Sequence, residues 1–243
     1  MLSLKKAVAW AQENKASFRD LGKPHIRRPL IILLTLMAFQ QFSGVNAILF
    51  NLKVIFESAK MSITSNVASI VVGSAQIAAT LVAAGLMDKA GRKILLVLST
   101  GGMAISLGSM GAYFYLPSEN NADSFDWLPV ASLMVFIFAF NTGFGPIPWI
   151  LLGELFSPDV KELAGSMAAL VSWEVVQSEG VQAIHNYGAY WLFSGMCVIS
   201  CIFTIIFVKE TKGKTPEEIT MMFGGNFDKN PGPKNLPIDS SQL

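Results

Sequence analysis

The sequence predicts an all-α membrane protein, on the evidence of its composition and its long apolar segments. Of its 243 residues, 52% are hydrophobic and 14% are charged, whereas soluble domains average about 25% charged residues. The mean hydropathy is +0.48. A bilayer core of about 30 Å requires roughly 20 mostly apolar helical residues, because lipid cannot hydrogen-bond an exposed backbone. Five segments meet this requirement: residues 30–50, 66–87, 94–116, 128–152 and 189–208. This pattern argues against a water-soluble enzyme.

A sixth and weaker candidate span covers residues 163–187. It starts with an apolar run, but polar side chains follow where a span needs apolar ones: Glu174, Gln177, Glu179 and His185. A central acidic residue costs about 3 kcal/mol on insertion scales, so this helix requires polar partners, a shifted register or an interfacial bend. We count the segment as membrane-associated.

The basic residues indicate how the spans are oriented. All but two of the 18 Lys and Arg residues lie before the first span or after the second, fourth and last spans. The two exceptions are Lys53 and Lys60. Because Lys and Arg collect on the cytoplasmic side, we expect both termini in the cytoplasm. This arrangement needs an even number of crossings, which argues that residues 163–187 cross as well and gives six spans.

The chain is expected to have three parts. Residues 1–28 are charged and predict a cytoplasmic linker rather than a signal peptide. Residues 29–208 hold the six-helix transmembrane bundle, and residues 209–243 form a cytoplasmic tail whose Gly-, Pro- and Asn-rich end predicts disorder. Cys197 and Cys201 offer neither a disulfide framework nor metal-ligand spacing, so no metal or cofactor is expected. A net charge of +1 argues against nucleic acid as a partner.

Three side-chain amides lie deep in the first span, at Gln40, Gln41 and Asn46. Amides both donate and accept hydrogen bonds, so they suit an uncharged ligand that bears many hydroxyls. The alternative is that they bond to neighbouring helices, at about 0.6 kcal/mol for an average contact. On a straight helix the three amides point in different directions, so they converge only if the helix unwinds near Ser43 and Gly44.

The fourth span carries the most specific local signal in the chain. Pro146 and Pro148 remove two backbone donors, while Gly143 and Gly145 permit unusual backbone dihedrals. The sequence therefore predicts a bent or broken helix. Broken helices at membrane depth are tolerated where they line a cavity, and in transporters they mark the binding site and the gate.

Three further polar or aromatic side chains are candidate ligand contacts. Trp149 follows the break and could stack on a sugar ring, although packing against lipid or protein is the alternative. Asn141 lies on the approach to the same break. Gln76 is the one strongly polar side chain of the second span, where its small neighbours also fit close helix packing.

Charged side chains in two loops on the basic side could pair with one another. Asp88 and Glu154 offer carboxylates, while Arg92 and Lys161 offer cations. Charges in loops are ordinarily solvated. A cluster that forms only when helices converge would instead act as a latch on one conformation of a carrier.

Four segments occur in an order that is typical of one transporter family: QQFSGVNA, DKAGRK, GFGPIPWILLGELFSPDVK and KETKGKTPEEI. With them the chain resembles the C-terminal half of the sugar porter family of the major facilitator superfamily, particularly insect facilitated trehalose transporters and facilitative glucose carriers. The resemblance covers almost the whole chain. It implies a twelve-helix carrier whose two six-helix halves rock about a central site.

The resemblance also implies residue roles. The substrate-binding positions would be Gln40, Gln41, Asn46, Gln76, Asn141, Trp149 and Trp173. A cytoplasmic charge network that holds the outward-facing state would comprise Asp88, Arg92, Glu154, Lys161 and Glu210. The chain departs from the family pattern at Ser172, where an Asn is usual, and at Lys209, where a Pro is usual. Asn141 stands where glucose carriers have an acid, and the stretch between Trp173 and Trp191 is several residues shorter.

The expected function is facilitative transport of a hexose or trehalose through the plasma membrane by alternating access. The chain is expected to be a fragment or truncated product, with a missing N-terminal six-helix half or a full-length relative as its partner. Proton symport is one alternative, and a non-transporting half-carrier that associates with full-length relatives is another. The segment 174–186 separates transport from association alone, because transport fails if this segment does not span the membrane. An intramembrane enzyme has little support, since no nucleophile, base and orienting group recur at useful spacing.

Overall fold

The computed structural model describes residues 22, 24–50, 52, 55–56, 65–115, 127–156, 158–176 and 186–224. These residues form helices joined by turns and short irregular segments, and no β-strand occurs among them. The predicted all-α class is confirmed for this part of the chain.

The helices differ in length and continuity. The long uninterrupted ones are α2 (Pro24–Phe42), α5 (Ser65–Ala90), α6 (Arg92–Tyr115), α9 (Pro158–Val176) and α10 (Asn186–Phe207). The shorter elements are α3 (Val45–Phe50), α7 (Leu128–Ala139), the π-helical turn η3 (Phe140–Phe144), α8 (Ile147–Leu155) and α11 (Pro216–Met222). Because α7, η3 and α8 follow one another along one membrane-length segment, we call them together the interrupted rod.

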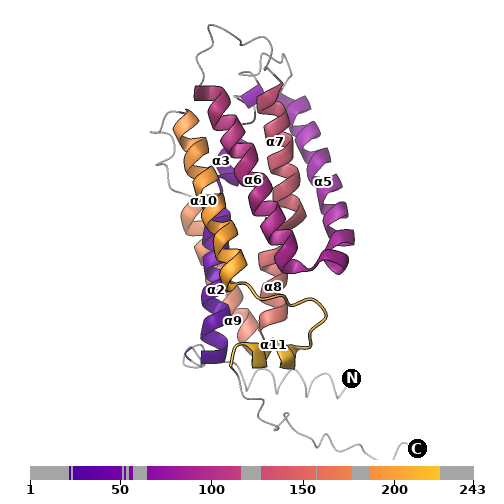
Figure 1. Cartoon of the computed structure of the whole chain (residues 1–243), viewed down its shortest axis with the longest axis vertical. Helices are drawn as coiled ribbons and strands as arrows, with labels where there is room; N and C mark the ends of the chain where they lie inside the picture. Colours follow the sequence, from indigo (N-terminus) through magenta and orange to yellow (C-terminus); the bar gives the residue numbers. More distant parts are fainter. Residues whose placement is uncertain are drawn as a thin grey trace, which may run out of the picture.

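The long helices run side by side along the longest axis of the molecule (Figure 1). α6 lies between α10 and α7, and α5 lies on the far side of α7. α2 packs against α9, and the short α11 lies near α8 at one end of the bundle. The α7 and η3 parts of the interrupted rod are therefore flanked by α5 and α6, while its α8 part packs against α2, α9 and α11.

Five stretches of the described chain are long and apolar enough to cross a membrane: Pro24–Leu49, Ile70–Met87, Arg92–Tyr115, Leu128–Leu155 and Tyr187–Phe207. Each of the five strong spans expected from the sequence overlaps one of them. The weaker segment is different, because α9 covers only its first part and is not among these stretches. Residues 177–185 lie outside the described residues, so the sixth crossing stays a prediction.

Small residues let α6 and α10 pack closely. The Ser194 hydroxyl of α10 donates to the Ala104 carbonyl of α6 at 2.7 Å. Nearby, a Cβ on Gly111 would overlap the Trp191 ring, so the glycine permits the close approach of that ring. Such contacts are the usual means by which helices associate in lipid, where burial of apolar surface gives no net advantage.

The outer faces of the bundle are apolar. Large hydrophobic side chains are exposed along α5, α6 and α10, among them Ile70, Leu81, Ile105, Ile202 and Ile206. Exposed apolar surface of this extent marks an interaction surface in a soluble protein. On helices of membrane-spanning length it fits contact with hydrocarbon.

α2 and α3 are separated by a two-residue turn at Ser43 and Gly44. Gly44 has a φ of 77°, which L side chains rarely adopt, and a Cβ there would overlap the Phe193 ring. The Ser43 hydroxyl donates to the Gln40 carbonyl at 2.6 Å, which satisfies a carbonyl at the end of α2. The helix is thus interrupted at the place where the sequence analysis expected unwinding to let Gln40, Gln41 and Asn46 converge.

The interrupted rod breaks where the sequence predicts a break. The Gly145 N–H donates to the Phe140 carbonyl at 2.7 Å, five residues back, which is the bond of a π-turn. Pro146 then precedes α8, and Pro148 lies in its first turn. Gly143 is buried against α6, so that a Cβ there would lie 2.6 Å from the Leu95 carbonyl oxygen. The glycine lets α6 approach the turn closely.

Candidate functional site

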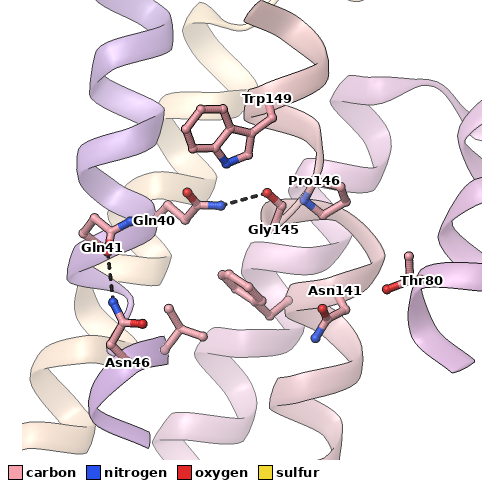
Figure 2. A pocket seen from close by; sticks show the side chains of 10 residues that line it. Gln40, Gln41, Asn46, Thr80, Asn141, Gly145, Pro146 and Trp149 are labelled. Atoms are coloured by element: carbon pink, nitrogen blue, oxygen red, sulfur yellow. Dashed lines mark hydrogen bonds between the residues drawn. The ribbon is translucent and has the colours of Figure 1, made fainter. Parts of the chain in front are cut away.

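A cavity of about 370 Å³ lies between α2, α3, α5 and the interrupted rod (Figure 2). Both breaks in the helices, at Gly44 and at η3, adjoin it. Its volume falls in the range of roughly 300–1,000 Å³ that small-molecule sites occupy. Its lining residues are Gln40, Gln41, Val45, Asn46, Thr80, Phe140, Asn141, Gly145, Pro146 and Trp149.

The structure brings together most of the side chains that the sequence predicts for the substrate site. Five line the cavity: Gln40, Gln41, Asn46, Asn141 and Trp149. Gln76 lies on α5 one turn before the lining residue Thr80 and is not itself in the lining. The side chain of Trp173 lies outside the described residues. Of the four residues expected at the helix break, Gly145 and Pro146 face the cavity as well.

Gln40 connects the two broken helices. Its amide nitrogen donates to the Phe144 carbonyl at 2.8 Å. It also donates to the Gly145 carbonyl at 2.9 Å, which is the bond drawn in Figure 2. In a regular helix the Phe144 carbonyl would accept from residue 148, but Pro148 has no N–H. Gln40 is buried, with 5% of its surface exposed, and it replaces the missing donor. Its amide nitrogen is therefore committed to the break, and its carbonyl oxygen is the group left for a ligand.

The other amides are oriented by hydrogen bonds as well. The Asn46 nitrogen donates to the Gln41 side-chain oxygen at 3.1 Å, which leaves the Gln41 nitrogen and the Asn46 oxygen for a ligand (Figure 2). The Asn141 nitrogen donates to the Ile137 carbonyl at 2.8 Å, so the Asn141 oxygen is the group left for a ligand. The Thr80 hydroxyl donates to the Gln76 carbonyl at 2.8 Å and retains its acceptor lone pairs.

The cavity is neutral and presents mainly acceptors. None of the described residues that line it is ionisable. Side-chain oxygens of Gln40, Asn46, Asn141 and Thr80 are available to accept, whereas Gln41 and the Trp149 indole can donate. The remaining lining is apolar or aromatic. This combination suits an uncharged ring that carries several hydroxyl donors and has an apolar face, and it offers no acid, base or nucleophile.

Sequence reasoning missed several lining residues. Thr80 lies one helical turn from Gln76 on the same face of α5, so the polar Gln76 indicated the correct face but the wrong turn. Phe140 adjoins Asn141, and Val45 adjoins Asn46. An apolar side chain inside an apolar span carries no signal that separates a cavity lining from lipid contact.

A second polar site, which we call the Arg92 cluster, comprises Arg92, Glu154, Glu210 and Thr211. It lies at the end of the bundle where α5 passes into α6. The Arg92 guanidinium contacts one carboxylate oxygen of Glu154 with two nitrogens, at 2.9 and 3.0 Å. The Thr211 hydroxyl donates to the other oxygen of Glu154 at 2.6 Å. Three of the five residues expected in the charge network therefore meet here.

The two other expected members are not part of this cluster as described. Lys161 is an exposed residue of α9, and within the described residues no ion pair joins it to the cluster. The side chain of Asp88 lies outside the described residues. Thr211 binds Glu154, but the sequence analysis did not predict it because it considered only charged side chains.

Glu210 binds the beginning of α6. Burial alone would raise its pKa, but backbone N–H groups of Lys212, Arg92, Lys93 and Thr211 donate to its carboxylate and together lower the pKa below the usual range for Glu. The N–H groups of Arg92 and Lys93 are at the first two positions of α6 and donate at 2.9 and 3.1 Å. A carboxylate is favoured there because these N–H groups lack helical partners.

Residues 3–223 match the protein family described as "Sugar (and other) transporter". The chain belongs to this family. Together with the apolar helices, this membership makes it a multi-pass membrane protein, and the expected resemblance to sugar porters of the major facilitator superfamily is confirmed. Its relatives are named as transporters, which points away from an enzyme.

Individual relatives of this sugar-transporter family member agree with one another. The facilitated trehalose transporter Tret1 of Polypedilum vanderplanki is 39% identical over 89% of this chain and 44% of its own length. The facilitated glucose transporter member 8 of solute carrier family 2 from Bos taurus is 40% identical over 88% of this chain and 50% of its own length. The chain thus spans about half the length of the curated relatives it matches.

A solved structure shows the same fold as this family member. The proton:xylose symporter XylE of the major facilitator superfamily, bound to 6-bromo-6-deoxy-D-glucose, superposes with a TM-score of 0.68 at 29% identity. The match covers 80% of this chain and 42% of that chain.

Proposed function

We propose that this chain is the C-terminal six-helix half of a facilitative sugar carrier and forms one wall of its central sugar site. The observation that carries the proposal is the neutral cavity, where two broken helices bring amides from α2, α3 and η3 together with Trp149. Relatives named as trehalose and glucose transporters, and a solved xylose symporter with a bound glucose derivative, support a sugar as the ligand.

In this proposal the sugar binds through its hydroxyls and one ring face. Hydroxyl groups donate to the oxygens of Gln40, Asn46 and Asn141 and accept from the Gln41 nitrogen, while the ring lies against Trp149. A second six-helix half supplies the opposite wall, and the two halves rock about the bound sugar. We favour facilitative transport over proton symport because the trehalose and glucose relatives are named as facilitated transporters.

We further propose that the end bearing the Arg92 cluster faces the cytoplasm and that both termini lie there, in the plasma membrane. Lysines concentrate at this end, among them Lys89, Lys93, Lys209 and Lys212. The cluster would then join loops on the cytoplasmic side and stabilise the outward-facing conformation, as the family resemblance implies. Glycosylation sites inserted near residue 121 and near the C-terminus test this topology, because only the former should be modified.

A chimaera provides the direct test of transport. In it, this chain replaces the matching part of the Polypedilum vanderplanki trehalose transporter, which supplies the rest of the carrier. We expect saturable uptake of radiolabelled glucose or trehalose by the chimaera and no uptake by the 243-residue chain alone. If the chimaera reaches the membrane but carries neither sugar, the transport proposal is wrong for this chain and a non-transporting half-carrier takes its place.

Gln41→Ala in the chimaera is expected to raise the KM for sugar about fivefold to tenfold while the protein still inserts. The change removes one donor to the ligand and the acceptor that orients Asn46, and a single hydrogen bond is worth about 1 kcal/mol. Concentration-dependent uptake at equal surface abundance measures the effect. Thr35→Val is the matched control on α2, since within the part of the chain that the structure describes its hydroxyl bonds only to the Ile31 carbonyl of its own helix. An unchanged KM in Gln41→Ala would remove Gln41 from the site.

A further inference from the structure

Ser99 lies on α6, outside the cavity, with 3% of its surface exposed. Its hydroxyl donates to the Ala139 carbonyl at 2.7 Å and accepts from the Phe144 N–H at 2.9 Å. Ala139 is the last residue of α7, and Phe144 is the last residue of η3. One hydroxyl from a neighbouring helix therefore spans the whole π-turn. We propose that Ser99 is a positioning residue, which fixes this turn in the geometry that binds sugar; this inference rests on the proposed sugar site.

The π-turn explains why such a residue is useful. In a regular α-helix the Phe140 carbonyl accepts from the N–H of residue 144, but here it accepts from Gly145 at 2.7 Å. Ser99 offers the Phe144 N–H a well-placed acceptor and gives the carbonyl at the start of the turn a donor. The Phe144 N–H needs such a partner, because Phe144 is 0% exposed and an unpaired backbone donor is costly at a buried position.

The approach of α6 to the turn depends on side-chain size. A Cβ on Gly143 would lie 2.7 Å from the Ser99 Cβ and 2.6 Å from the Leu95 carbonyl oxygen. Glycine at 143 and a short hydroxyl-bearing side chain at 99 therefore fit one another. A larger residue at either position would separate α6 from the π-turn.

Ser99 and Gln40 hold the same buried residue from two sides. Phe144 is 0% exposed; its N–H donates to Ser99 of α6, and its carbonyl accepts from Gln40 of α2. Asn141 lies within the turn so fixed, and Trp149 lies just beyond it. Removing the Ser99 hydroxyl therefore loosens two ligand contacts without removing any atom that lines the cavity.

The test compares Ser99→Ala with Ser106→Ala in the chimaera. Ser106 lies on the same helix and is equally buried at 3%, but among the described residues its hydroxyl donates only to the Met103 carbonyl of its own helix, at 2.9 Å. We expect Ser99→Ala to speed hydrogen–deuterium exchange of peptides covering residues 140–150 about tenfold and to raise the KM for sugar by a similar factor. Ser106→Ala should change neither quantity, even if it lowers the melting temperature equally.

The exchange measurement needs no sugar, so it separates the two proposals. If the unaltered chimaera carries no sugar, the transport proposal fails while exchange still decides whether Ser99 fixes the turn. Unchanged exchange in Ser99→Ala overturns the role of Ser99, and faster exchange with an unchanged KM overturns its link to sugar binding. Should Ser99→Ala fail to insert, Ser99→Gly also removes the hydroxyl without enlarging the side chain, and it is compared with Ser106→Gly in the same way.

Discussion

Gln40→Glu is expected to weaken sugar binding by the chimaera about 100-fold or more at pH 7. The amide nitrogen of Gln40 donates to two carbonyls of the interrupted rod, at Phe144 and Gly145. A carboxylate in its place would point acceptor oxygens at two acceptors, in a position that is 5% exposed. An uncompensated buried charge costs about 3–5 kcal/mol in the folded state, which favours separation of α2 from the break. Sugar binding must then restore the break, and each 1.4 kcal/mol that this requires lowers the affinity about tenfold.

Two comparisons make the Gln40→Glu result specific. Gln41→Glu is the matched control, because the Gln41 nitrogen has no bond to the break and the side chain is less buried. We expect it to lose less affinity than Gln40→Glu in equilibrium binding of radiolabelled sugar. Lowering the pH to about 5 should partly restore Gln40→Glu, since a protonated carboxyl again donates one hydrogen bond. Equal losses in the two variants, with no recovery at low pH, would mean that Gln40 does not support the break.

The amino-acid sequence was sufficient to predict where the helices break and which amides gather. Pro146 and Pro148 remove backbone donors wherever they stand, so a break follows from local chemistry alone. Convergence of Gln40, Gln41 and Asn46 depended on a turn near Gly44, and the structure has that turn. These features are local, which is why they can be read without knowledge of the fold.

The partners of these groups could not be predicted. The two carbonyls that bind Gln40 lie more than 100 residues along the chain, and nothing local links an amide in one span to a break in another. Ser99 looks like an ordinary small residue of a helix interface. Thr80 rather than Gln76 lines the cavity, because the packing of the helices determines which turn of α5 lies beside the cavity. The sequence therefore indicates which groups are unusual, while the fold determines what each of them binds.

In the Arg92 cluster, too, the sequence indicated the unusual groups but not all of their partners. Opposite charges in two loops predicted a pairing, and Arg92 does bind Glu154. Glu210 instead binds backbone N–H groups at the start of α6 and in its own loop, which no charge pattern reveals. Gly91, with a φ of 89°, makes room for it, because a Cβ at that position would lie 2.6 Å from the Glu210 carboxylate. Glu210 therefore holds the start of α6 in place through backbone hydrogen bonds, rather than by pairing with a charged side chain.

If the Arg92 cluster stabilises the outward-facing conformation as proposed, Glu210→Ala is expected to destabilise that conformation by about 2 kcal/mol, a shift of roughly 30-fold toward the inward-facing one. The change leaves four N–H groups without their carboxylate acceptor, although water can reach some of them. Reactivity of a cysteine introduced at Leu155 toward a membrane-impermeant thiol reagent, in inside-out vesicles, measures opening. Glu218→Ala, in the capping box of α11, is the control on the same face. Equal reactivity of this cysteine in the two variants would show that Glu210 does not stabilise the outward-facing conformation.

The pH dependence of stability follows from the direction of the Glu210 pKa. Because the folded pKa lies below the usual value of about 4.3, the carboxylate stabilises the fold fully above that value. This stabilisation is lost as the pH falls through the lowered pKa. The difference in melting temperature between the unaltered protein and Glu210→Ala should therefore be constant from about pH 8 to pH 5 and shrink only below about pH 4. A difference that already shrinks between pH 7 and pH 5 would show that the four N–H groups do not hold this carboxylate.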